Sequence, residues 1–158
     1  NIGDKYRNVV GIFMNQILEE KPLTIFGDGE QTRAFTHVDE VAPYIANSVN
    51  VPKARNSIFN IGSDSVYSVL ELALAVIKAM DAEVIVRQFE KREEVMHAYA
   101  DHTNFEEVFK PTKQVILTDG LLEMAQWTKK NGASKSADFD QIEIQKNLPE
   151  SWINPTEE

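Results

Sequence analysis

Cysteine is absent from this sequence of 158 residues. The absence excludes a disulfide scaffold, a thiolate metal site and a cysteine nucleophile. No apolar run is long enough to span a membrane and no signal-peptide pattern opens the chain, so we expect a soluble cytoplasmic protein without a membrane partner. Basic residues are outnumbered, with 16 against 25 acidic residues and a formal net charge of −9. This balance argues against nucleic acid as a partner, although one or two arginines can still hold a small phosphorylated ligand.

The usual phosphate-binding glycine motifs are also missing. The stretch GDGEQTRAFTHVDEV, residues 27–41, contains two glycines, but position 32 is threonine where the dinucleotide fingerprint G-x-G-x-x-G needs a third glycine. A β-prone run follows instead of a helix. The Gly-Lys-Ser/Thr of a P-loop and the ligand spacing of a calcium loop are absent as well. These three kinds of site are therefore excluded at residues 27–41.

Potential metal ligands are present, but their spacing is wrong. His37 and Asp39, even together with His97, Asp101 and His102, match no established zinc pattern. Helix capping explains Asp39 more simply, and the histidines are expected to be ordinary surface or core residues. We therefore expect no metal site.

A tight turn between two strands is the simplest interpretation of residues 27–29. It accounts for Asp28 and Gly29, which form a common turn dipeptide. It does not account for Arg33, which lies just inside the second β-prone run. A single arginine on a strand is usually a solvated edge charge, and the residues alone leave that interpretation open.

Periodicity and turn signals predict alternating helices and strands. The predicted helices span residues 8–20, 39–50, 68–80, 102–109 and 118–131, and the predicted strands are LTIF (23–26), AFTHV (34–38), SIFNIG (57–62) and EVIVRQFE (83–90). Ser68 and Glu71 form a capping box, and Asp39 and Thr118 are the expected caps of two other helices. The expected apolar face of the last helix consists of Leu121, Leu122, Ala125 and Trp127.

Composition changes at residue 133 and divides the chain into a domain, residues 1–132, and a C-terminal linker and tail, residues 133–158. The tail is acidic and begins with small polar residues. It also contains the apolar residues Ile142, Ile144, Leu148 and Trp152. We therefore expect residues 139–153 to pack on the domain surface or on a neighbouring chain.

Several motifs resemble one family in the correct order. GDGEQTRAFTHVDEVA resembles the Gly-Asp-Gly-x-Gln-x-Arg-x-Phe/Tyr-x-x-Val-Asp-Asp/Glu-Val motif of the NAD(P)-dependent nucleotide-sugar epimerases and dehydratases, which are extended short-chain dehydrogenases. FNIGSD, SVLELA, REEVMHAYAD and TDGLLEMAQW agree in order, so the resemblance runs from residue 1 to about residue 130. It covers the second half of the family's chain, and the sequence resembles the C-terminal half of the UDP-glucose 4-epimerases, the best-known members.

The resemblance implies an α/β fold: the C-terminal substrate-binding part, a small mixed sheet with helices, with the Rossmann half missing. That first half carries the family's G-x-x-G-x-x-G cofactor loop and its catalytic Tyr-x-x-x-Lys pair. Neither pattern occurs here. No set of glycines has the spacing of the cofactor loop, and none of the tyrosines is followed by lysine four residues on: Tyr6, Tyr44, Tyr67 and Tyr99. We therefore expect no catalytic residue and no cofactor-binding residue in this chain, whereas NAD is the cofactor of the intact family enzyme.

The resemblance assigns ligand contacts to the first motif. Arg33 matches the arginine that holds the nucleotide diphosphate, a role that suits a planar guanidinium. Phe35, expected on the same strand face, matches the aromatic residue beside the nucleotide. Thr24 and Phe26 match the strand positions against the uracil, where a flat apolar ring is favoured.

Two further segments match ligand-binding positions of the family. Asn8 and Val9 open the first predicted helix and match positions that meet the diphosphate and the base, which is reasonable because helix N-termini attract anions. In KREEV, residues 91–95, Arg92 matches a phosphate-binding arginine and Glu94 an acid that accepts from the ribose hydroxyls. The segment is one residue shorter than the common family form, so Lys91 is an alternative to Arg92.

The implied function is that of the nucleotide-sugar-binding portion of an NAD-dependent sugar epimerase or dehydratase, with a UDP-sugar as ligand and no turnover by this chain alone. A nucleotide-sugar dehydratase or decarboxylase of the same family is one alternative. A truncated binding or interaction module is a second. A third is an active enzyme of another class that uses Asp39, His97 or Asp101.

Association is expected through residues 38–62. In the resembling family this region packs on the Rossmann half, with the strand SIFNIG joining its sheet. Without that half, an apolar helix face at Val41, Ile45 and Val49 and the edge of the 57–61 strand are expected to be uncovered. We therefore expect a homodimer or a larger assembly, because a symmetric pairing most often covers such a surface.

Overall fold

The computed structural model describes residues 2–3 and 8–134. Its elements are α1 (Val9–Leu18), β1 (Leu23–Phe26), β2 (Thr32–Ala34), η1 (Val38–Glu40), α2 (Ala42–Asn47), η2 (Ser48–Asn50), η3 (Pro52–Ala54), β3 (Val66–Ser68), α3 (Val69–Met80), β4 (Val86–Phe89), β5 (His97–Ala98), α4 (Thr103–Phe109) and α5 (Leu117–Asn131). Within the described ranges, no helix has the length and apolar character needed to cross a membrane. The predicted packing of residues 139–153 lies outside the described residues.

Two small sheets organise the strands. β1 pairs in parallel with β4, and β2 lies between β3, which is antiparallel to it, and β5, which is parallel. The predicted α/β class with a small mixed sheet is confirmed. The simple turn interpretation is wrong in one respect, because the strands on either side of Asp28 and Gly29 belong to different sheets and do not pair with each other.

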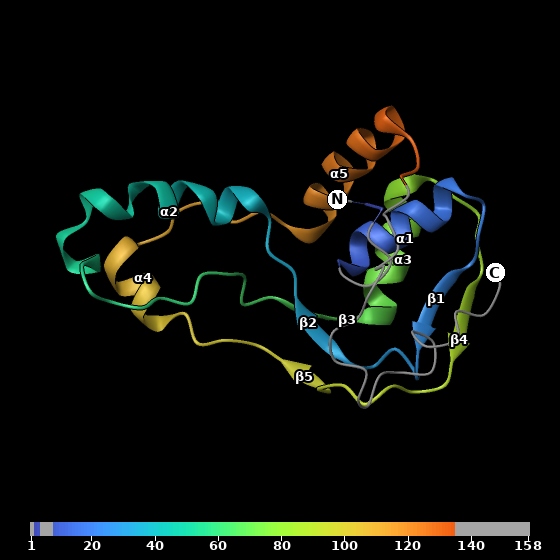
Figure 1. Ribbon diagram of the computed structural model, residues 1–158, viewed down its shortest axis with the longest axis horizontal. Coiled ribbons are helices and arrows are strands. Elements are labelled where there is room, and N and C mark those ends of the chain that lie inside the picture. The colour runs from blue at the N-terminus through green and yellow to red at the C-terminus, as the bar shows by residue number, and fades with distance from the viewer. Residues whose placement is uncertain (1, 4–7, 135–158) are drawn as a thin grey trace, which may run out of the picture.

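The core lies where α1, α3 and α5 pack together over β1 (Figure 1). Its fully buried side chains alternate along β1 and follow the helical period along α1 and α3: Phe13, Met14, Leu23, Ile25, Leu72 and Val76. The capping box that begins α3 is present as predicted. The Ser68 hydroxyl accepts from Glu71 N at 3.1 Å, and Glu71 Oε2 accepts from Ser68 N at 2.7 Å. Local pattern and burial therefore agree in this half of the domain.

α2 and α4 lie apart from this core, at the end of long extended connections (Figure 1). Their contact is aromatic: the Tyr44 ring lies edge-on to Phe105 and Phe109, with centroids 5.1 Å and 6.2 Å away. Phe59 adds a further edge-on contact to Phe109 at 5.3 Å. We call residues 36–64 and 99–116 the arm. The arm contains a second, smaller apolar cluster, in which Phe105 is the buried aromatic residue.

The predicted strand at residues 57–62 is wrong, because these residues belong to no strand and Gly62 lies in a bend. A strand exists only when a neighbouring strand satisfies its N–H and C=O groups. The described residues supply no such neighbour at this place. Apolar exposure in the arm is nevertheless large, with Val49 86 % and Ile58 91 % exposed.

Two predicted helix caps are also wrong. η1 is capped by His37, whose Nδ1 accepts from Asp39 N at 3.3 Å, so Asp39 supplies a backbone donor rather than the cap. α5 begins after Ile116 without a side-chain cap, and Thr118 is already inside the helix. In both cases the backbone turns into the helix earlier than the polar residue suggested.

The apolar face predicted for α5 is half correct. Leu121 and Ala125 are buried as predicted, but Leu122 and Trp127 are 49 % and 53 % exposed. The buried stripe follows the spacing of 121, 125 and 128, so its next member is Thr128. The Thr128 hydroxyl donates to Met14 Sδ at 3.6 Å, which satisfies its polarity inside the core.

Candidate functional site

The candidate site lies between two chain segments that pair twice in parallel. β1 and β4 end together at the pair Phe26–Phe89, and β2 and β5 begin together at the pair Thr32–His97. Gly27 N donates to Phe89 O at 3.0 Å, and Thr32 N donates to Met96 O at 2.8 Å. The intervening loops, residues 27–31 and 90–96, are therefore held against each other.

The first loop needs its glycines for shape. Gly29 has a φ of 81°, and a Cβ on it would come within 3.0 Å of Leu70 Cβ on α3. Gly29 O also accepts from Leu70 N at 3.1 Å, so the loop is attached to α3. Asp28 Oδ1 accepts from Glu30 N at 3.0 Å and closes the turn. The glycines of residues 27–31 thus form a tight turn, as the turn interpretation predicts, and the turn packs against α3, which that interpretation does not predict.

Arg33 is anchored on one side and partly available on the other. Its Nη1 donates to Thr32 O at 2.8 Å and to Met96 O at 3.3 Å, and its Nη2 donates to Glu94 Oε2 at 3.0 Å. A guanidinium has five N–H groups. Within the described part of the chain, Nε–H and one Nη2 hydrogen have no acceptor. Arg33 is therefore not the solvated edge charge of the simpler interpretation.

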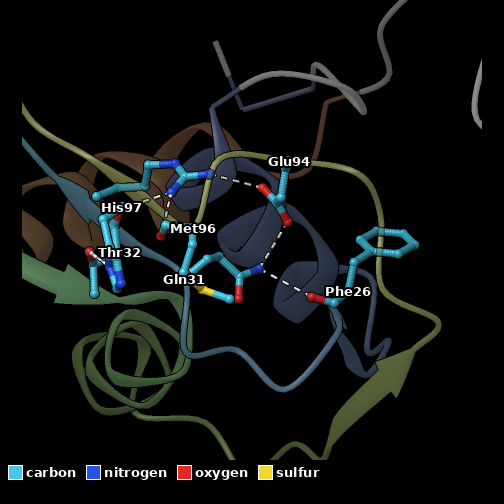
Figure 2. A network of polar contacts seen from close by, with 7 residues as sticks. Phe26, Gln31, Thr32, Glu94, Met96 and His97 are labelled. Carbon is cyan, nitrogen blue, oxygen red and sulfur yellow. Dashed lines mark hydrogen bonds and ion pairs between the residues drawn. The ribbon is translucent and has the colours of Figure 1, made fainter.

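Glu94 and Gln31 complete the polar network (Figure 2). Gln31 Nε2 donates to Glu94 Oε1 at 3.1 Å and to Phe26 O at 3.1 Å. Glu94 therefore accepts from Gln31 on one carboxylate oxygen and from Arg33 on the other. The structure brings together two predicted ligand residues, Arg33 and Glu94, that are 61 positions apart in the sequence.

Aromatic and cationic groups lie beside this network. Phe26 and Phe89 are 5.7 Å apart between ring centroids, and Arg92 Cζ lies 3.2 Å from the Phe26 ring centroid. Such a contact is a cation–π interaction. Burial lowers the pKa of the Arg92 guanidinium, and the nearby Glu94 carboxylate opposes that change. Arg92 therefore lies on Phe26, the ring predicted to meet the uracil.

Thr24 shares the outer face of β1 with Phe26, since Leu23 and Ile25 point into the core. Its hydroxyl accepts from Gln16 Nε2 at 2.9 Å, and Thr24 N donates to Gln16 Oε1 at 3.3 Å. The side chain is thus held against α1.

A small hollow lies between the two loops. Its walls are Phe26, Gly27, Asp28, Gln31, Lys91, Glu94 and Met96, and its volume is about 10 Å³. Space of this size holds at most one water. A larger ligand must therefore lie across the rim of the hollow.

Three predicted ligand residues lie away from this hollow. Asn8 caps α1, with its Oδ1 accepting from Gly11 N at 3.4 Å, and Val9 packs against the core. Phe35 follows the end of β2 and lines a different cavity of about 90 Å³, together with Val10 and residues at the start of α5. Of the eight predicted ligand residues, Phe26 and Glu94 line the hollow, Arg33 pairs with Glu94 and Arg92 lies on Phe26.

The residues of the alternative active sites are scattered. Asp39 pairs with Lys113, whose ammonium lowers the pKa of the carboxyl group. The His97 ring nitrogen Nδ1 lies 2.9 Å from Thr32 Oγ1. Asp101 Oδ1 accepts from Thr103 N at 2.8 Å at the start of α4, and Thr103 lowers the pKa of Asp101. Across residues 2–3 and 8–134, no group of three or more His, Asp or Glu side chains could hold a metal ion.

Sequence reasoning assigned no role to Gln31, although it stood inside the quoted motif. The signal that could have found it is the family motif itself, because Gln31 matches the glutamine that this motif specifies two positions before the arginine. The structure shows that Gln31 is 7 % exposed and joins both loops.

Comparisons with known proteins agree on one family. A sequence model described as the NAD dependent epimerase/dehydratase family matches residues 2–62. The chain is 33 % identical over 127 residues to a putative UDP-glucose 4-epimerase of Methanocaldococcus jannaschii, covering 78 % of this chain and 39 % of that protein. It is 29 % identical over 129 residues to a UDP-N-acetyl-alpha-D-glucosaminuronate decarboxylase of Bacillus cytotoxicus, covering 77 % and 40 %. The chain thus spans about two fifths of the length of these relatives.

Solved structures show the same relationship. The UDP-glucose 4-epimerase of Thermotoga maritima, solved with UDP-glucose, superposes with a TM-score of 0.72 at 28 % identity, covering 82 % of this chain and 42 % of that one. A UDP-glucuronic acid 4-epimerase variant from Bacillus cereus, solved with a fluorinated UDP-sugar and NAD, gives a TM-score of 0.71 at 27 % identity and the same coverage.

Proposed function

Because this chain belongs to the NAD-dependent epimerase/dehydratase family, we propose that it is the nucleotide-sugar-binding portion of a UDP-sugar epimerase of the UDP-glucose 4-epimerase kind. One observation carries the proposal: Arg33 and Glu94 meet at 3.0 Å between two loops, beside the ring of Phe26. A cation, an acceptor and a flat apolar surface are the three groups that a nucleoside diphosphate needs. The cytoplasmic location expected from the sequence remains a prediction.

In this proposal Arg33 holds the diphosphate. Its two N–H groups without an acceptor are enough for a charge-assisted contact to phosphate oxygens. Its anchors, Thr32 O and Met96 O, are backbone groups that accept from Nη1, whereas the two N–H groups proposed for phosphate lie on Nε and Nη2. The contact therefore requires no loss of the present Arg33 hydrogen bonds.

Glu94 accepts from the ribose hydroxyls, and the outer face of β1 at Thr24 and Phe26 carries the uracil. Each carboxylate oxygen of Glu94 has a second lone pair beyond the contacts it already makes. Arg92 lies over one face of Phe26, and Lys91 in the wall of the hollow is the alternative for the second phosphate contact. The roles of Asn8, Val9 and Phe35 rest on the motif resemblance alone.

The proposed function of this chain is binding rather than turnover. A dinucleotide pyrophosphate needs a glycine-rich connection between a strand and the following helix. Between β2 and η1, between β3 and α3 and between β5 and α4, the described connections contain no glycine. The Ser68–Glu71 capping box also occupies N–H groups at the start of α3. These residues do not fit an NAD site, and we assign no step of a reaction to them.

Two alternatives have support of their own. The similarity to a UDP-N-acetyl-alpha-D-glucosaminuronate decarboxylase favours a decarboxylase or dehydratase of the same family, whose nucleotide contacts would be shared. The exposed apolar side chains of the arm favour an interaction module. A nucleotide-binding measurement separates the second alternative from the proposal.

The test is isothermal titration of the 158-residue chain with UDP, ADP and NAD. We expect UDP to bind weakly, ADP to bind less well, and NAD to give no heat, together with no conversion of UDP-galactose to UDP-glucose. Uracil discrimination is expected because the base lies against a specific strand face. Tight NAD binding would contradict the assignment, and equal failure of UDP and ADP would favour the interaction module.

We also propose association through the arm. Burying the apolar side chains of residues 38–62 between two copies removes them from water, at roughly 25 cal/mol per Å² of apolar surface. We expect light scattering to give the mass of a dimer or larger at micromolar concentration, and Ile58→Asp to give a monomer. Ile85, 67 % exposed beside β4 and outside the arm, provides the matched control Ile85→Asp. A wild-type monomer with a folded arm would contradict the proposal.

A further inference from the structure

Gln31 is the buried polar residue at the centre of the site. It is 7 % exposed, and its Nε2 donates to Phe26 O and to Glu94 Oε1, each at 3.1 Å. A primary amide nitrogen carries two hydrogens, and both are used here. A carbonyl oxygen and a carboxylate only accept hydrogen bonds, so the nitrogen of the amide must face them. The orientation of Gln31 is therefore determined by its partners.

The two contacts of Gln31 connect three parts of the site. Phe26 O is the last carbonyl of β1, Glu94 belongs to the loop of residues 90–96, and Gln31 itself precedes β2 (Figure 2). Residues 31 and 94 are 63 positions apart in the sequence. A single buried amide thus links the end of one sheet to the loop that leads to the other.

Glu94 depends on its neighbours for its position. Its side chain is 36 % exposed, and a partly exposed glutamate normally samples several rotamers, at an entropic cost when it is held in one. Gln31 holds one carboxylate oxygen, and Arg33 holds the other at 3.0 Å. Of these two partners, Gln31 is the more deeply buried, because the Arg33 side chain is 26 % exposed. The buried Gln31 is therefore the fixed partner that holds the Glu94 carboxylate in position.

We propose that Gln31 is a positioning residue for the diphosphate site: it fixes the Glu94 carboxylate, which in turn fixes the plane of the Arg33 guanidinium. The inference rests on the proposed function, since it concerns how Arg33 and Glu94 are held for UDP. Thr32 O and Met96 O hold only Nη1 of Arg33. The hydrogen bond from Nη2 to Glu94 is the second point of attachment, and it prevents rotation of the Arg33 guanidinium. A group held in its binding orientation before the ligand arrives loses less conformational freedom on binding.

The first test removes the amide. UDP binding of the 158-residue chain is measured by isothermal titration for Gln31→Leu and for Gln88→Leu. Gln88 is the matched control, because its Nε2 donates to Asp28 O at 3.3 Å on the same loop without touching Glu94. We expect Gln31→Leu to weaken UDP binding about three- to tenfold and Gln88→Leu to have little effect. Combined with Glu94→Ala, Gln31→Leu should cause little further loss, because its action passes through Glu94.

The second test distinguishes positioning from general stability. Gln31→Glu places a carboxyl group beside Glu94, and two adjacent carboxyl groups raise the pKa at which one of them ionises. Below that raised pKa the single O–H of the protonated group donates to Glu94, which restores the contact that positions Glu94 but not the contact to Phe26 O, and above it the two anions repel. The measured quantity is the association constant for UDP of Gln31→Glu divided by that of Gln88→Glu. This ratio should be near one at about pH 5.5 and fall several-fold by about pH 8.

The outcomes separate this inference from the proposed function. If the wild-type chain binds no UDP, the proposed function and the positioning role both fail. If the wild-type chain binds UDP while both Gln31 variants match their Gln88 controls at every pH, only the positioning role of Gln31 fails. A loss that is the same at every pH, with a lowered unfolding midpoint, also contradicts positioning and assigns Gln31 to stability alone.

Discussion

Arg33→Ala should lower the affinity for UDP by about ten- to a hundredfold, because truncation of a charge-assisted contact typically costs about 1.5–3 kcal/mol. The substitution removes the two N–H groups proposed for the phosphate oxygens. It also leaves Glu94 Oε2 without its partner at 3.0 Å, but that carboxylate is partly exposed and water can replace the lost contact. The expected loss is therefore mainly a loss of ligand binding. Titration with UDP and thermal unfolding of the same samples measure the two effects separately.

Arg33→Lys and Arg87→Ala are the controls for this experiment. Lysine keeps the charge but lacks the planar fork, so we expect Arg33→Lys to bind UDP with an intermediate affinity. Arg87 lies on β4 and is exposed, and its removal changes the net charge equally. We expect Arg87→Ala to bind UDP nearly as the wild type does. An unchanged dissociation constant in Arg33→Ala would show that the diphosphate is held elsewhere.

Leu72→Ala should lower the free energy of unfolding by about 2–5 kcal/mol. Leu72 is 0 % exposed on α3, at the place where α1, α3 and α5 pack over β1. Its truncation loses the transfer energy of the buried methyl groups and leaves a cavity that rigid neighbours only partly close. A loss of this size is a large fraction of the stability of a domain. Urea denaturation followed by circular dichroism measures it.

Leu74→Ala is a closely matched control, because the same change is made two residues away on the same helix. Leu74 is 56 % exposed, since a shift of two positions turns the side chain away from the core. We expect Leu74→Ala to change the free energy of unfolding by no more than about 0.5 kcal/mol. Equal losses for the two variants would mean that α3 does not present the face described above.

Part of the site could be predicted from the sequence. The motif of residues 27–41 identified Arg33, and the second motif identified Glu94, so two partners of one ion pair were named before their contact was known. The turn at Asp28 and Gly29 was also predicted, because its geometry depends on the backbone preferences of these residues. The resemblance implied that both segments contact one nucleotide, but the direct ion pair between Arg33 and Glu94 and the role of Gln31 between them were not predicted.

Errors in the fold have related causes. Residues 57–62 read as a strand because they are apolar and β-prone, yet a strand also needs a neighbour, and the described residues provide none. Trp127 read as a core residue because it is large and apolar, but the helical spacing set by Leu121 and Ala125 turns it outward, 53 % exposed. In each case the residue type favours the predicted structure, but the partner strand or the core that this structure requires does not lie next to the residue.

The sequence by itself determined the features that depend on neighbours a few residues away. These are the period of α1, the capping box of α3 at Ser68 and Glu71, the end of α5 at Gly132 and the turn between β1 and β2. Tertiary structure alone decided that β1 pairs with β4 and β2 with β5, and so brought Gln31, Arg33 and Glu94 together. The physical reason is that these contacts join residues more than 60 positions apart, and such residues meet only when the chain folds around the shared core of α1, α3 and α5. Local propensities carry no information about which distant strand will satisfy a given edge.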